Sequence, residues 1–214
     1  EFMTKSSPMP HIFQKILLTL SLLAATLAQA QLSIEITGAG ANRIPVAIAN
    51  FAGDAAAAQV VASTVRSDLE RSGLFKLVDP AGATLDENAQ VNFGDWKNRG
   101  ADALAAGSLA RGADGRMEAR FRLYDTQKQV SLGGAVYVTG NDQLRAAGHR
   151  IADYIYEKLT GEKGVFSTRV AYVVKTGGQF RLQIADADGQ GAVTALSSSE
   201  PIISPVWSPD GSKL

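Results

Sequence analysis

The spacing of apolar residues predicts a strand followed by a long helix near the start of the chain. Residues 44–51 are almost continuously apolar, which is typical of a strand buried on both faces. Residues 55–72 carry apolar side chains every four positions, which predicts one apolar stripe along a helix. Asp54 is placed to cap the start of this helix, and Gly73 stands where a glycine ends one.

More strands and a second long helix follow. Short apolar runs at 75–78 and 103–109 predict two strands. Residues 117–124 alternate between apolar and polar, which predicts a strand with one face in water, and 129–138 predict its hairpin partner. Residues 143–160 return to helical spacing, which predicts a helix with an apolar face able to cover a sheet.

This order of elements predicts an α+β domain over residues 31–163. We expect a mixed sheet of about five strands with two long helices packed on it. Asn141 and Asp142 are placed to cap the start of the second helix, and Gly161 to end it. The small and polar residues 81–93 predict a loop.

From residue 164 the rhythm changes to strands without helices. Residues 168–175, 180–186 and 192–197 predict three short strands separated by glycine-containing turns. This rhythm is typical of a β-sandwich or a propeller. We therefore expect residues 164–214 to form a second domain.

The first residues have the features of an export signal. Glu1 and Phe2 precede a methionine and are typical of a cloning scar. Residues 3–30 then combine a basic start with an apolar run shorter than the roughly 20 residues of a membrane span. Small residues at Ala28 and Ala30 predict cleavage before Gln31. A buried N-terminal helix is the alternative.

Charge and cysteine content exclude several classes of function. Lys and Arg number 21, as do Asp and Glu, so the net charge is zero and predicts no binding of nucleic acid. The chain has no cysteine, which excludes disulfides, thiolate zinc sites and cysteine nucleophiles.

Chemical motifs in the chain are weak, so we expect no catalytic residue, no metal site and no cofactor. His149 and Asp153 stand four apart on the second helix, but no second His or Cys is near, and we expect both to pack on the helix surface. Asp186 and Asp188 lack the further acidic ligands of a calcium loop, which favours a hairpin turn. The Gly-rich stretch 38–40 lacks the third glycine of a dinucleotide loop.

Longer sequence matches point to a known family. Residues 207–214 contain Ser-Pro-Asp-Gly, a tight turn between propeller strands in which Pro fixes φ and Gly supplies a positive φ. Upstream, several stretches together resemble the TolB family, the propeller proteins of the Tol–Pal envelope system: Ala147-Gly148-His149, Asp153, Glu157-Lys158-Leu159-Thr160-Gly161, Lys163-Gly164, Phe166, Thr168-Arg169 and Ala171-Tyr172-Val173-Val174. The resemblance covers the chain from residue 31 onward and is weakest at 81–92.

The resemblance implies an interaction protein of the periplasm and not an enzyme. Its first domain would resemble the anticodon-binding domains of some tRNA synthetases in fold alone. Residues 164–214 would be the incomplete first blade of a six-bladed propeller. The family's N-terminal segment binds TolA, its propeller binds Pal, and the system maintains outer-membrane integrity and assists cell division.

On this reading the TolA-binding segment directly follows the predicted cleavage site. It comprises Gln31, Leu32, Ser33, Ile34, Glu35, Ile36, Thr37 and Gly38. Its alternating residues could add as a strand to a sheet edge of the partner, or could pair permanently within the chain.

Two other functions are compatible with the sequence. The chain could belong to a secreted propeller hydrolase whose catalytic domain, carrying a G-x-S-x-G motif, lies beyond residue 214. It could also be a periplasmic domain that binds a small ligand, which would require a cleft.

Overall fold

The structure is a computed structural model and describes residues 42–214. The predicted signal peptide, its cleavage site and the predicted strand at 32–37 lie outside the described residues. Among the described residues no helix has both the length and the apolar character needed to cross a membrane.

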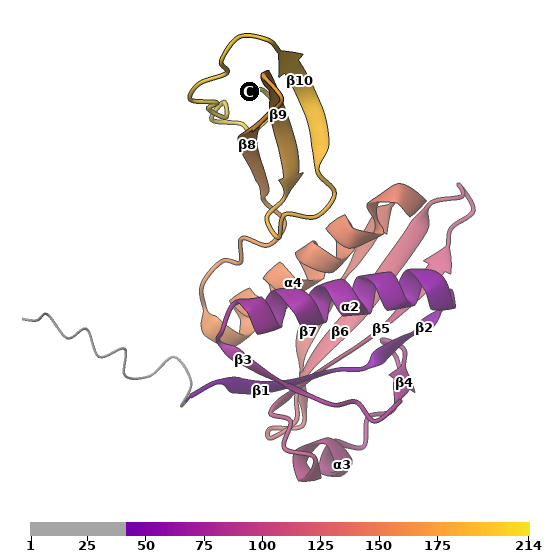
Figure 1. Ribbon diagram of the computed structural model, residues 1–214. Helices are drawn as coiled ribbons and strands as arrows, with labels where there is room; N and C mark the ends of the chain where they lie inside the picture. The colour runs from indigo at the N-terminus through magenta and orange to yellow at the C-terminus, as the bar shows by residue number, and fades with distance from the viewer. Residues whose placement is uncertain (1–41) are drawn as a thin grey trace, which may run out of the picture. The chain divides into compact units, whose positions relative to one another are not determined.

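A mixed sheet lies at the centre of residues 44–160 (Figure 1). Its strands are β1 (Ile44–Ile48), β2 (Asn50–Gly53), β3 (Phe75–Val78), β4 (Thr84–Leu85), β5 (Ala103–Arg111), β6 (Met117–Asp125) and β7 (Val130–Thr139). β1 pairs in parallel with β3 and β5, whereas β5, β6 and β7 pair antiparallel. The predicted mixed sheet is confirmed.

β1 and β2 are two halves of one bent strand. Ile48 lies opposite Ala105 and Ala52 opposite Ser108, so the first strand carries one extra residue between these pairs, which is a β-bulge. β3 pairs with the first half and β4 with the second, which gives five positions across the sheet although seven strands are counted. The guanidinium of Arg66 donates to the carbonyl of Ile48 at 2.7 Å and so satisfies the backbone at the bend.

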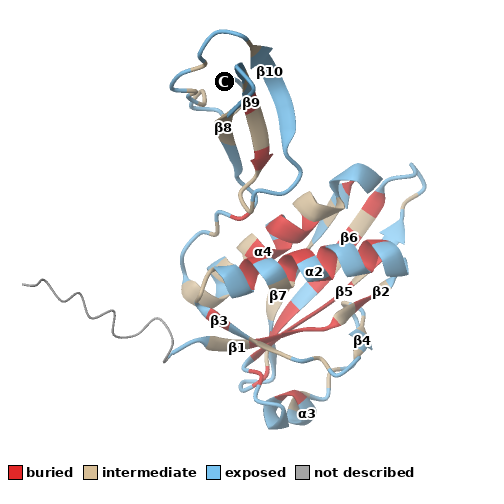
Figure 2. Ribbon diagram, in the orientation of Figure 1, coloured by how far each residue is buried: buried red, intermediate tan, exposed pale blue. Residues whose placement is uncertain are grey.

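Helices α2 (Ala55–Arg71) and α4 (Leu144–Thr160) cover the same face of the sheet (Figure 1). The amide of Ala57 donates to the Asp54 side chain at 3.1 Å, as predicted for the cap of α2. The stripe Val61, Val65 and Leu69 is fully buried against the strands (Figure 2).

The start of α4 differs from the prediction. Asn141–Gln143 form a 3₁₀ turn, η2, and no side chain caps the first turn of α4. Asn141 and Asp142, predicted to cap an α-helix, instead belong to this turn, whose 3₁₀ geometry is tighter than that of an α-helix. Gly161 ends α4 with a φ of 81°, as predicted for a C-terminal glycine.

A smaller apolar cluster covers the opposite face of the sheet. It centres on Trp96 of α3 (Phe93–Asn98), which packs near Leu104 and Tyr124. The predicted loop at 81–93 is mostly irregular but contributes the two-residue strand β4.

The three strands predicted after residue 164 form one antiparallel sheet. They are β8 (Arg169–Thr176), β9 (Gln179–Asp186) and β10 (Val193–Ser198), in the order β10–β9–β8. Val170, Val193 and Leu196 are exposed on this sheet. Such exposure is what a propeller blade shows where a neighbouring blade would pack.

Gly148 sets how closely α4 approaches α2. A Cβ placed on Gly148 would lie 2.7 Å from Cβ of Thr64 and 3.1 Å from the carbonyl oxygen of Val61. We expect Gly148→Ala to force the helices apart and lower the free energy of unfolding by about 1–3 kcal/mol. Urea denaturation followed by circular dichroism measures this loss.

Gly94→Ala is the matched control. Gly94 lies in α3, and a Cβ there meets no atom closer than 3.3 Å. It should leave stability unchanged or raise it slightly, because alanine is the better helix former. Equal effects of the two substitutions would show that the approach of the helices is not limiting.

Candidate functional site

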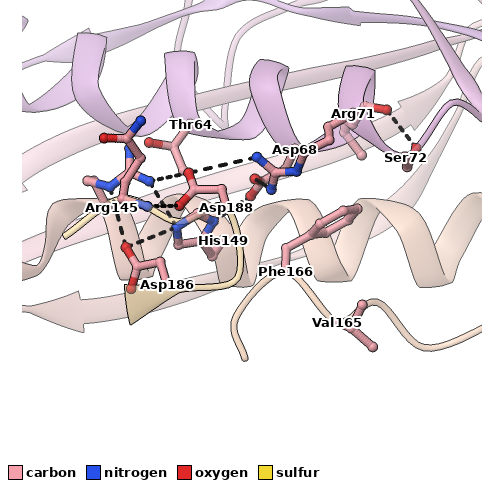
Figure 3. A network of polar contacts seen from close by, with 12 residues as sticks. Thr64, Asp68, Arg71, Ser72, Arg145, His149, Val165, Phe166, Asp186 and Asp188 are labelled. Carbon is pink, nitrogen blue, oxygen red and sulfur yellow. Dashed lines mark hydrogen bonds and ion pairs between the residues drawn. The ribbon is translucent and has the colours of Figure 1, made fainter. Parts of the chain in front are cut away.

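The predicted partner-binding residues, Gln31–Gly38, lie outside the described residues, as do Ala28 and Ala30. Within residues 42–214, the densest group of charged side chains surrounds His149 (Figure 3). We call this group the His149 cluster. Its members come from two helices, from the end of β9 and from the turn after it: Asp68, Arg71, Arg145, His149, Asp186 and Asp188.

His149 is buried between α4 and α2. Its side chain is 2% exposed, and its Nδ1 lies 2.5 Å from Oδ2 of Asp68, whose side chain is 0% exposed. The other carboxylate oxygen of Asp68 accepts from Arg71 at 2.6 Å. The expectation that His149 packs on the helix surface is therefore wrong. Gly148 brings α4 so close to α2 that the next residue reaches a carboxylate on the other helix.

The last residue of β9, Asp186, and the turn that follows, with Asp188, supply the other two carboxylates. Arg145 forms ion pairs with Asp188 and, at 3.4 Å from its Nε, with Asp186. Nε2 of His149 also lies 3.4 Å from Oδ2 of Asp186. The predicted hairpin turn at Asp186 and Asp188 is confirmed, and its side chains face α4 and α2.

Charge in the cluster balances only when His149 is protonated. Three carboxylates then face two guanidinium groups and one imidazolium. Burial of the ring, the largest single effect, lowers the pKa of His149, but the hydrogen bond to Asp68 and the three surrounding carboxylates raise it above the ordinary value of 6.5. Burial works to raise the pKa of Asp188, yet hydrogen bonds from the Gln190 backbone and from Arg145 hold it below its usual range.

Ligand atoms of His149, Asp186 and Asp188 lie within 4.8 Å of one another, a separation that a metal ion could bridge. One feature opposes that use: the guanidinium of Arg145 pairs with both Asp186 and Asp188. A metal ion would have to displace Arg145, so the arrangement is an ion-pair cluster.

Asp153 has a separate role one turn further along α4. Its two carboxylate oxygens accept from the backbone N–H groups of Phe166 at 2.7 Å and Ser167 at 3.0 Å. Phe166 packs on Tyr156 with ring centroids 5.6 Å apart. Asp153 thus ties the segment before β8 to α4, and its partners are these backbone groups and not His149.

One sequence signal could have located the cluster. Asp68 follows Val65 by three residues and Val61 by seven, so a carboxylate stands on the same buried side of the helix as the apolar stripe. A buried carboxylate requires a cation or several donors. Only two histidines exist in the chain, which makes His149 the natural candidate.

Two models of known protein families match the chain. A family model described as the TolB amino-terminal domain matches residues 32–132. A second, described as the TolB beta propeller domain, matches residues 156–214. The chain belongs to the TolB family.

Individual TolB proteins resemble most of the chain. The Tol-Pal system protein TolB of Dechloromonas aromatica is 76% identical over 206 residues, which cover 96% of this chain and 48% of that protein. The protein of the same name from Aromatoleum aromaticum is 57% identical over 199 residues, 90% of this chain and 47% of that protein.

A solved structure agrees with the fold. The crystal structure of TolB from Acinetobacter baumannii superposes with a TM-score of 0.68 and 37% identity, over 83% of this chain and 44% of that chain. The chain therefore spans about half the length of the TolB proteins it matches.

We expect Asp68→Asn to weaken the TolB-type first domain most at low pH. The substitution removes the charge that stabilises protonated His149, so about 3 kcal/mol of unfolding free energy should be lost near pH 6. A group with a raised folded pKa stabilises fully below its unfolded pKa and loses that contribution as pH rises through the folded value. The loss in Asp68→Asn should therefore shrink at alkaline pH. Urea denaturation at several pH values measures it.

Asp142→Asn is the control, because Asp142 is exposed in η2 at the start of α4. It should change stability little at any pH. A loss in Asp68→Asn that is the same at acid and alkaline pH would contradict the coupling to His149.

Proposed function

We propose that this chain is a non-catalytic interaction protein of the Tol–Pal system, acting in the periplasm. One observation carries the proposal: a protein named Tol-Pal system protein TolB is 76% identical over 96% of the chain. The descriptions of both matched families name a TolB domain and no reaction. They give no support to a propeller hydrolase or to a small-ligand-binding domain.

The finer proposal assigns one partner to each part of the protein. The N-terminal segment Gln31–Gly38 binds TolA, and the propeller that begins near residue 164 binds Pal. Linking the two maintains outer-membrane integrity and assists cell division. The chain's boundaries in this scheme are a signal at 3–30, a first domain at 31–163 and a blade at 164–214.

The described residues limit where an N-terminal strand could pair. β1 begins at Ile44 and lies between β3 and β5, so both of its hydrogen-bonding edges are occupied. A preceding strand could add only at an outer edge, such as that of β3 or β7 in this chain or that of a partner. A sheet edge of a partner would satisfy its backbone groups.

Calorimetric titration with the C-terminal domain of TolA tests the proposal. Protein starting at Gln31 should bind, and a copy lacking Gln31–Gly38 should not. Replacing Leu32, Ile34 and Ile36 by Ser should weaken binding at least about tenfold, since one face of an added strand would lose its apolar contacts.

The matched control replaces the alternate residues, Ser33, Glu35 and Thr37, by Ala. In an added strand these residues would face the other side, so binding should change far less. Unchanged binding after deletion of Gln31–Gly38 would place the TolA site elsewhere. Binding of TolA by neither protein would reject the linker function for this chain.

A further inference from the structure

We propose that the His149 cluster is a proton-operated latch, which holds the β9–β10 turn against α2 and α4 while His149 is charged and loosens when His149 is neutral. This goes beyond the proposed function, since it concerns how the first blade is held to the first domain. It rests on four geometric observations.

The first is that the turn is held by charged groups. Its ion pairs to the two helices, within residues 42–214, join Asp188 to Arg145 and Arg71, and Asp186 to Arg145 and His149. Asp188 is 6% exposed and His149 is 2% exposed, whereas Asp186 and Arg145 are about a third exposed. Solvent screens the two buried members less than it screens surface charges, so a change of charge on His149 is felt by the turn.

The second concerns the two nitrogens of His149. Nδ1 faces Asp68, a carboxylate that must receive a proton donor there because it is wholly buried. The proton of a neutral imidazole is therefore held on Nδ1. Nε2 then carries a lone pair and faces a carboxylate oxygen of Asp186 at 3.4 Å, so two acceptors oppose each other. Protonation places an N–H on Nε2 and turns this contact into an attraction.

The third is the alternative open to the neutral ring. Nη2 of Arg145 lies 3.4 Å from Nε2 of His149 and also pairs with Asp188. A neutral Nε2 accepts one of the two N–H groups of this nitrogen, and the other remains available to Asp188. Loss of the proton therefore replaces the attraction of His149 to Asp186 by a hydrogen bond within α4.

The fourth is the set of charges that face His149 from each neighbouring element. α2 contributes Asp68 and Arg71, α4 contributes Arg145, and β9 with its turn contributes Asp186 and Asp188. Carboxylates outnumber guanidiniums, which agrees with the raised pKa of His149. The latch is closed below the ordinary pKa of histidine and opens as pH rises through the raised value.

Nuclear magnetic resonance of the full chain tests the latch directly. The chain has two histidines, so the ring signal of His149 has to be distinguished only from that of His11. Amide exchange of Gly189 and Gln190 in the turn should lose protection, corrected for intrinsic rates, by roughly three- to tenfold between about pH 6 and pH 9. The pH midpoint of this loss of protection should coincide with the midpoint of the titration of the His149 ring.

Three variants separate the latch from a merely structural role. Asp188→Asn and Asp186→Asn should each move the His149 midpoint to lower pH and reduce turn protection at pH 6. His149→Gln should make turn protection independent of pH. Glu200→Gln, an exposed carboxylate of the same blade, is the control and should change neither measurement.

Turn protection in the unaltered chain that does not vary with pH would overturn the proposal. So would a pH response that persists in His149→Gln. If His149→Gln does not fold, Asp186→Asn decides alone, because its partly exposed side chain can lose its charge without leaving a cavity. An unchanged His149 midpoint in that variant would reject the latch.

Discussion

Close contact between α4 and α2 is the constraint on which the rest of the structure depends. Two helices can approach this closely only where one offers no side chain, and Gly148 provides that point against Thr64. The approach buries Val61 and Ile151 on the same side of the sheet. It also places a histidine of one helix beside a carboxylate of the other, where water cannot reach either. Packing and charge are therefore set by the same glycine.

Charge at this point links segments distant in sequence. Asp68 and Asp188 stand far apart along the chain, yet one arginine, Arg71, approaches both carboxylates. Arg145 and His149 complete the set from α4. These side-chain charges thus form a physical connection between the helices α2 and α4 and the end of β9.

Sequence patterns predicted the elements well, because strand and helix periods reflect local burial. The elements predicted at residues 55–72, 117–124 and 143–160 are present, and their observed bounds differ from the predicted ones by no more than one residue. The bulge at Ile48–Ala52 could not be predicted from the sequence, since it depends on the register with β5 and on Arg66 from α2. The pairing of His149 was missed for the same reason: its partners belong to other elements. The missing side-chain cap of α4 reflects the 3₁₀ turn before it.

Asp153 gives the chain a mechanical property. Its two oxygens hold consecutive backbone N–H groups just before β8, and Phe166 is wedged against Tyr156, which itself contacts Phe75 of β3. A connection clamped in this way has lost most of the torsional freedom of a hinge. A force on β8 is therefore transmitted to α4 and to β3 at the edge of the sheet, with little extension of the connecting residues.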